Sequence, residues 1–148
     1  VIAQHQDTTA PQQAAQERGK WAIGYNCDTS DIVPEAFLTA PVWNWAPYYA
    51  DQVQKVIDGT WKSENYWGGM EDGIVDLAPL TKNAPEGAQA KVDEMKAKII
   101  NGEFDVFDGP IKDQSGKIRV PEGSSLTDEE KLSFDWFVEG VIGTLPEK

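Results

Sequence analysis

Apolar and polar residues alternate in blocks along the first part of the chain, and the blocks predict strands separated by helices. Short apolar runs bounded by turn residues are typical of buried strands, and they occupy residues 1–5, 21–25 and 37–43. Residues 11–18 are rich in Gln and Ala, start at a proline and precede Gly19, so they predict a helix. Residues 28–35 predict a loop or a short helix. This order favours an α/β fold with parallel strands and right-handed crossovers.

A second helix is predicted over residues 47–58, between Pro47 and Gly59. Its apolar residues follow the i, i+4, i+7, i+8 spacing of a helix face packed on a sheet. These residues are Tyr49, Val53, Val56 and Ile57.

The second half of the chain is less regular. Residues 68–73 carry glycines without the lysine of a phosphate loop and predict a turn, and residues 74–77 predict a short strand. A helix is expected from Pro85 to about residue 100, with Ala88, Val92, Met95 and Ile99 on one face and a Glu94–Lys98 pair. Residues 104–120 predict a hairpin that turns at residues 114–116. Thr127 and Glu130 match a capping box, and the helix after them would carry Phe134, Phe137, Val138 and Val141 on one side.

Composition and charge narrow the possible functions. The 148 residues are 40% hydrophobic with a mean hydropathy of -0.49, which is a globular composition and not a disordered one. The net charge of -12 would repel the phosphate backbone of nucleic acids and an anionic membrane face. No stretch approaches about 18 consecutive apolar residues. Cys27 is the single cysteine, and beside Asp28 it is expected to be a small packed residue rather than a nucleophile.

Motifs for metal binding or group transfer are missing from the sequence. His5 is the single histidine, and no Cys-x-x-Cys, Walker, GxSxG or GxGxxG pattern occurs. We therefore expect no cofactor, no metal site and no catalytic residue.

Polar and aromatic residues gather where the predicted strands end. Ligands of open parallel sheets bind outside the carboxyl ends of the strands, and these groups together offer carboxylates, amides, a hydroxyl and indoles but no cation. That set suits a neutral heteroaromatic ring, because amides and carboxylates pair with ring nitrogens and an exocyclic amine while indoles stack on the ring. The candidate ligand-binding residues are Gln6, Asp7, Thr8, Asn26, Asp28, Trp43, Asn44 and Trp45.

Structural roles compete with these assignments. Asp7, with Thr8 and Thr9, could cap the next helix, and Asp28 could cap a short helix. Trp43 and Trp45 point to the same face of a strand, so one of them could belong to the core. His5 is expected to be a structural histidine.

Three segments in the right order resemble the basic membrane protein family. The segment Trp-Gly-Gly-Met-Glu-Asp-Gly-Ile-Val-Asp-Leu-Ala-Pro-Leu, residues 67–80, resembles that family's glycine-rich signature. Residues 98–103 resemble its Lys-x-Ile-x-x-Gly helix ending, and residues 24–28 stand where the family has Gly-x-Asp-x-Asp. The likeness covers residues 1 to about 105. The family contains substrate-binding lipoproteins of ABC importers, including purine-nucleoside receptors.

The resemblance implies a type I periplasmic-binding fold, in which two α/β lobes enclose a ligand cleft. This chain would be the carboxyl-terminal half, and an amino-terminal lobe of the same protein would supply the rest of the cleft. Residues 1–38 and 61–106 would belong to the second lobe, and residues 39–60 would be a hinge strand and helix that cross to the first. Residues 107–148 would form a carboxyl-terminal extension with a hairpin and a final helix.

Two departures from the family pattern bear on the ligand. The nucleoside-binding members carry an aspartate where this chain has Asn26, and a lysine–arginine pair where it has Trp43-Asn44. Losing these charges would remove a ribose site and add aromatic area. The resemblance therefore implies a free nucleobase, adenine above all, rather than a nucleoside.

The sequence thus predicts a solute receptor that closes on a purine-like ligand and does no chemistry. It would be periplasmic or at the cell surface, anchored as a lipoprotein, and would dock on ABC permease subunits. The alternatives are a ligand-sensing regulatory domain of the same fold, a nucleoside hydrolase using Asp7 or Asp28 as its base, and a protein-interaction module with exposed Trp43 and Trp45.

Overall fold

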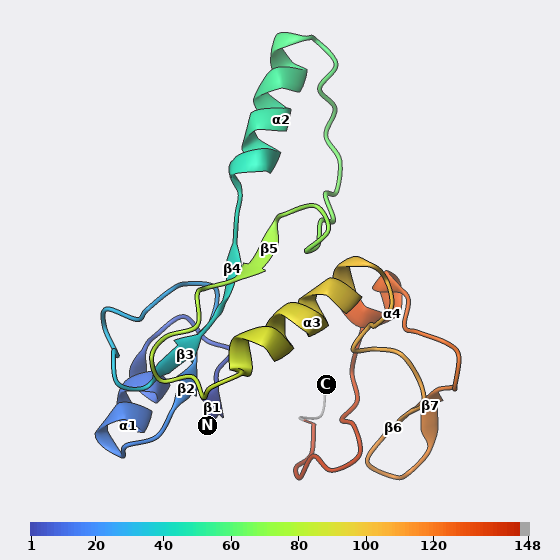
Figure 1. Cartoon of the computed structure of the whole chain (residues 1–148). Coiled ribbons are helices and arrows are strands. Elements are labelled where there is room, and N and C mark those ends of the chain that lie inside the picture. The colour runs from blue at the N-terminus through green and yellow to red at the C-terminus, as the bar shows by residue number, and fades with distance from the viewer. Residues whose placement is uncertain (146–148) are drawn as a thin grey trace. The chain divides into compact units, whose positions relative to one another are not determined.

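A three-stranded parallel sheet organises the first part of the chain in the computed structural model, which describes residues 1–145 (Figure 1). Its strands β1 (Ile2–Ala3), β2 (Ala22–Ile23) and β3 (Phe37–Thr39) lie in the order β1-β2-β3 and pair in parallel. Helix α1 (Ala10–Glu17) connects β1 to β2, and a loop of turns connects β2 to β3. The parallel α/β prediction is confirmed, and the sheet belongs to the first of two compact units, Val1–Ile100.

Two small clusters of buried residues form the core of this unit. Ala15 of α1 packs with Ala22 and Ala36, so the helix side of the sheet is filled by methyl groups. Phe37 is fully buried and packs with Val33 and with other residues of the second cluster, Ala40 and Ala78. Both clusters bury residues that lead into or out of strands, and this packing holds the strand ends in place.

The predicted strand over residues 37–43 is two strands, and in this respect the prediction was wrong. The chain leaves the sheet at Ala40, and Pro41–Trp43 forms β4, which pairs antiparallel with β5 (Val75–Leu77). Pro41 has no N–H to donate to a ladder, which favours a new strand that starts at the proline. The predicted strand over residues 74–77 is confirmed as β5.

Helix α2 (Ala46–Ile57) lies within one residue of the predicted range 47–58 but does not have the predicted packing. The helix ends before Gly59, which has a φ of 67°. None of its residues is buried, and the four apolar residues of its stripe are 59–72% exposed. The reason is visible in Figure 1, where the β4–β5 ribbon carries α2 away from the three-stranded sheet.

Helix α3 (Ala88–Ile100) follows β5 and ends before Gly102, as predicted. Lys98 Nζ lies 2.6 Å from Glu94 Oε1, which confirms the expected pair. Its apolar residues Val92, Met95 and Ile99 line a cavity of about 310 Å³ with residues that include Leu77 of β5. The face was therefore assigned correctly, although no residue of α3 is buried.

The second compact unit begins at Asn101. Strands β6 (Ile111–Lys112) and β7 (Ile118–Val120) pair antiparallel around a turn that Gly116 closes by donating to the carbonyl of Asp113 (2.9 Å), so the predicted hairpin is confirmed. Helix α4 (Asp128–Leu132) begins with the predicted capping box of Thr127 and Glu130.

The prediction that α4 carries the four apolar residues Phe134, Phe137, Val138 and Val141 was wrong, because the helix ends at Leu132. The backbone beyond it bonds to the hairpin and forms no further helix in the described residues. Glu139 N donates to the carbonyl of Lys112 at 2.9 Å, and Gln114 N donates to that of Phe137 at 3.1 Å. Across residues 1–145, no helix combines the length and apolar composition needed to cross a membrane.

Candidate functional site

The first two groups of predicted site residues lie at the ends of neighbouring parallel strands. Gln6, Asp7 and Thr8 follow β1, and Asn26 and Asp28 follow β2. The two strand ends contact each other through the rings of His5 and Tyr25, whose centroids are 4.7 Å apart in an edge-on arrangement. The structure therefore brings these two groups to one edge of the sheet.

Hydrogen bonds at the end of β1 are local. Gln4 Nε2 donates to the carbonyls of Gln6 and Thr8, each at 3.1 Å, and Gln6 Nε2 donates to the carbonyl of Thr8 at 3.4 Å. Thr9 stands at the cap position of α1 but makes no side-chain cap bond, and Asp7 is exposed. Gln4 Oε1 is buried without a hydrogen-bond partner. Gln4 was missed as a candidate, and its polar side chain inside a predicted strand was the available signal.

Backbone requirements explain much of the segment after β2. A Cβ on Gly24 would lie 2.9 Å from Phe37 Cε2, so the strand approaches β3 too closely for a side chain. Asn26 has a φ of 55°, a conformation that asparagine tolerates better than most residues. Asp28 Oδ1 accepts a 2.9 Å hydrogen bond from Ser30 N, and because residues 28–36 form turns and no helix, Asp28 organises this loop and does not cap a helix. Asn26 is half-buried.

The third group lies on the β4–β5 ribbon and at the start of α2. The rings of Trp43 and Trp45 stack at 5.6 Å with an interplanar angle of 21°, so they do share a face. They are 45% and 42% exposed, and neither belongs to the core. Asn44 is held by the ribbon, because its N donates to the carbonyl of Ile74 at 2.7 Å and its Nδ2 to that of Gly73 at 3.2 Å.

Trp43 and Trp45 open onto an apolar cavity of about 490 Å³. Its size lies within the range of small-molecule pockets, about 300–1,000 Å³. No charged side chain is among the residues that line it: Trp43, Trp45, Tyr48, Tyr66, Trp67, Gly68, Ile74 and Val75. Tyr48, Tyr66 and Trp67 were missed as candidates, and the density of aromatic residues around them was the signal that could have found them.

The structure does not bring all three predicted groups together. Within residues 1–145, no hydrogen bond, ion pair or ring contact links the ends of β1 and β2 to Trp43, Asn44 or Trp45. The polar groups and the aromatic cavity are therefore two separate parts of unit Val1–Ile100.

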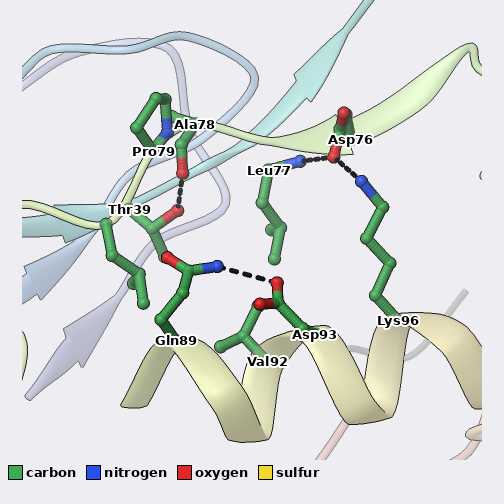
Figure 2. A pocket seen from close by; sticks show the side chains of 10 residues that line it. Thr39, Asp76, Leu77, Ala78, Pro79, Gln89, Val92, Asp93 and Lys96 are labelled. Carbon is green, nitrogen blue, oxygen red and sulfur yellow. Dashed lines mark hydrogen bonds and ion pairs between the residues drawn. The ribbon is translucent and has the colours of Figure 1, made fainter. Parts of the chain in front are cut away.

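A polar pocket of about 200 Å³ lies between β5 and α3 and was not predicted (Figure 2). Lys96 Nζ lies 2.5 Å from Asp76 Oδ1, and Leu77 N donates to the same oxygen at 2.7 Å. The hydrogen bond from Lys96, followed by that from the Leu77 backbone, lowers the pKa of the Asp76 carboxyl. Gln89 Nε2 donates to Asp93 Oδ1 at 2.8 Å. These polar groups pair with one another, so we interpret the pocket as the junction of α3 with the ribbon.

No group of three or more His, Cys, Asp or Glu side chains is placed to hold a metal ion in the part of the chain that the structure describes. The expectation that the protein uses no cofactor stays a prediction.

Comparisons with known proteins agree with the fold. Residues 1–109 match the model of the Bmp family, described as ABC transporter substrate-binding protein PnrA-like. A purine-binding protein of Brucella abortus is 42% identical over 147 residues, and a putative ABC transporter glucose-binding protein of Haloferax volcanii is 33% identical over 147 residues. Each alignment covers 99% of this chain. The chain spans 42% and 35% of the length of these two relatives.

Two solved structures share the fold. A transcriptional activator of the comK gene from Bacillus halodurans superposes with a TM-score of 0.54 at 23% identity, over 62% of this chain and 32% of that one. An ABC transporter solute-binding protein from Conexibacter woesei superposes with a TM-score of 0.51 at 20% identity, over 64% and 33% of the two chains. The chain therefore has the periplasmic-binding α/β fold and corresponds to part of it.

Proposed function

The chain belongs to the Bmp family of PnrA-like ABC transporter substrate-binding proteins, and we propose that it forms part of a receptor that captures a purine-like ring for an ABC importer. The observation that carries the proposal is the apolar cavity beside the stacked Trp43 and Trp45, which no charged side chain lines. The proposal is supported by the 42% identity to a protein described as purine-binding. The receptor works outside the cytoplasm, anchored as a lipoprotein, and delivers its ligand to the permease subunits.

Ligand recognition divides between the two parts of the site. Trp43 and Trp45 provide flat apolar surface, and stacking a base on an aromatic side chain is worth ~1–3 kcal/mol. Asn26, with Gln6, Asp7, Thr8 and Asp28, offers donors and acceptors at the sheet edge. Asn44 holds the ribbon in register beside the two tryptophans. A ligand that binds the closed form better shifts the population toward that form. When the protein closes, both parts approach the same ligand.

Helix α2 is the part of the chain that we assign to the amino-terminal lobe of the same protein. Its stripe of Tyr49, Val53, Val56 and Ile57 is well exposed although its spacing is that of a packed helix face. In this assignment residues 39–60 cross from the second lobe to the first, residues 1–38 and 61–106 belong to the second, and residues 107–148 are an extension.

The favoured ligand is a free nucleobase such as adenine. Neither Asn26 nor the Trp43-Asn44 pair carries a charge that could hold ribose hydroxyls, and the cavity beside Trp43 is lined by rings and aliphatic groups. A sugar is the second candidate, because the Haloferax volcanii relative is described as a glucose-binding protein.

Calorimetry on the full-length protein with adenine, adenosine and glucose tests the proposal. We expect adenine to bind most tightly and to be recovered unchanged, since no catalytic residue is assigned. Tighter binding of adenosine would overturn the free-base assignment, and tighter binding of glucose would move the protein to the sugar receptors. No binding of any of the three would contradict the purine proposal and favour the regulatory or interaction-module alternatives.

A further inference from the structure

The segment between α2 and β5 folds back toward the stacked tryptophans. The rings of Tyr66, in this segment, and Tyr48, in α2, lie 4.5 Å apart between centroids. Tyr48 also contacts Trp45, with centroids 6.3 Å apart. Tyr66 is thereby connected through Tyr48 to the Trp43–Trp45 stack.

The glycine at position 68 leaves room for the ring of Tyr66 beside the backbone. A Cβ on Gly68 would lie 2.7 Å from Tyr66 Cζ, so any other residue at position 68 would displace the ring. The turn that follows is held by Asp72, whose Oδ2 accepts a 2.9 Å hydrogen bond from Gly69 N. Glycine at position 68 therefore leaves the space that the ring of Tyr66 occupies.

Tyr66 and Trp67 stay well exposed for residues of their size, although Tyr66 packs against Tyr48. Tyr66 is 40% exposed and Trp67 is 62% exposed, yet both line the same 490 Å³ cavity as Trp43 and Trp45. Ligand pockets are commonly lined by large apolar and aromatic side chains. Burial, together with the negative charge of Asp72 and Asp51, raises the pKa of the Tyr66 hydroxyl, which stays a neutral donor.

We propose that Tyr66 and Trp67 form a second aromatic wall of the ligand site, so that a flat uncharged ring contacts this wall as well as Trp43 and Trp45. This inference rests on the proposed function. It assigns ligand contact to residues 66 and 67, which follow the hinge helix. It also implies that the cavity selects the ring of the ligand and not an attached sugar.

The test is calorimetry with adenine on the full-length protein and on the variants Tyr66→Ala, Trp67→Ala and Trp43→Ala. Trp61→Ala is the matched control, because Trp61 lies in the same segment and is 50% exposed but does not line the cavity. We expect Tyr66→Ala and Trp67→Ala each to weaken adenine binding by roughly 5- to 150-fold, the range for loss of one stacked ring. Trp61→Ala should change the affinity less than about twofold by the same reasoning, and Trp67→Phe should retain most of it.

The outcomes separate the two proposals. If the unaltered protein binds no adenine, the purine proposal fails and this inference fails with it. If Trp43→Ala weakens binding while Tyr66→Ala and Trp67→Ala do not, the inference is overturned and the purine proposal stands. If Trp61→Ala weakens binding as much as Trp67→Ala, the segment acts through its fold and the second wall is refuted. Unfolding midpoints of all variants, measured without ligand, identify any variant that loses affinity because it loses structure.

Discussion

Replacing Gly24 with alanine should destabilise the sheet edge that carries Asn26 and Asp28. The added Cβ would lie 2.9 Å from Phe37 Cε2 and 3.0 Å from the Ala40 Cβ. Non-bonded carbons prefer separations of about 3.5–4.0 Å. Phe37 is fully buried, and the 2.9 Å hydrogen bond from Gly24 N to the carbonyl of Thr39 holds the strands together. Neither the ring nor the backbone can therefore move away freely.

The expected cost follows from two opposing effects. Overpacking a filled core typically costs ~1–3 kcal/mol. Removing a glycine restricts the unfolded chain and returns ~0.4–1 kcal/mol where the native backbone suits alanine. We therefore expect Gly24→Ala to lower the free energy of unfolding by about 1–2 kcal/mol. Urea denaturation followed by tryptophan fluorescence measures the change.

A double-mutant cycle identifies the cause. In a Phe37→Leu background the Cε2 atom is absent, so Gly24→Ala should cost clearly less than in the natural background. Gly19→Ala is the control, since Gly19 has a φ of 59° and no atom near its added Cβ. Its cost comes from backbone strain and should be the same in both backgrounds. Equal costs of Gly24→Ala in the two backgrounds, or a stabilised Gly24→Ala variant, would refute the argument from close packing.

Two further predictions concern polar contacts. Lys96→Met should lower the free energy of unfolding by at most about 1 kcal/mol at neutral pH, because the paired Lys96 and Asp76 side chains are 33% and 48% exposed and screened by water. The folded-state pKa of Asp76 is depressed, so this contribution is present above the ordinary value of 3.8 and is lost as the pH falls through the folded-state value. Urea midpoints of the two proteins should therefore converge in acid, and a constant difference down to full protonation would contradict the ion pair. Thr127→Ala should destabilise α4 by ~0.5–2 kcal/mol, whereas Thr127→Ser should keep the capping hydrogen bond. Amide hydrogen exchange of α4 measures the stability of the helix in both variants. Equal exchange rates in the two variants would contradict the capping bond.

Local signals were sufficient to predict most elements of the chain. The bounds of α1 and α2 follow from a proline at the start and a glycine after the end, and the capping box marks the start of α4. The hairpin follows from its turn residues. The parallel sheet follows from the alternation of strands and helices, which the structure confirms.

Predictions that depended on distant contacts were wrong. The periodicity of α2 correctly indicated an apolar face, but it carried no information on what would cover that face, and within the described chain nothing does. The helix predicted through Phe134 and Val138 fails because the backbone beyond Leu132 pairs with the β6–β7 hairpin, a partner that periodicity does not reveal. The break at Ala40 was missed for a different reason, since Pro41 was present as a signal and its effect on the ladder was underestimated.

The candidate site was predicted only in part for the same reason. Strand ends are local features, so the polar groups after β1 and β2 and the pair of tryptophans could be found from the sequence. Tyr66 and Trp67 line the cavity because the segment before β5 folds back toward Tyr48. Residue spacing in the sequence does not predict such a contact.

The way in which the β4–β5 ribbon leaves the sheet has a mechanical consequence. Ala78 N donates to the carbonyl of Ala40 at 2.8 Å, and the Thr39 hydroxyl donates to the carbonyl of Ala78 at 2.6 Å, so the ribbon is held together at its base, where β4 starts and β5 ends. The tip is fastened as well, by Asn44 and Ile74. Because the ribbon is hydrogen-bonded at both ends, we expect it to move as one rigid element, so that a small rotation at its base would displace α2 by a larger distance. Trp43 pairs with Val75 at the tip of the ribbon and Trp45 stacks on it just before α2, so these rings should move together with the helix and keep their arrangement.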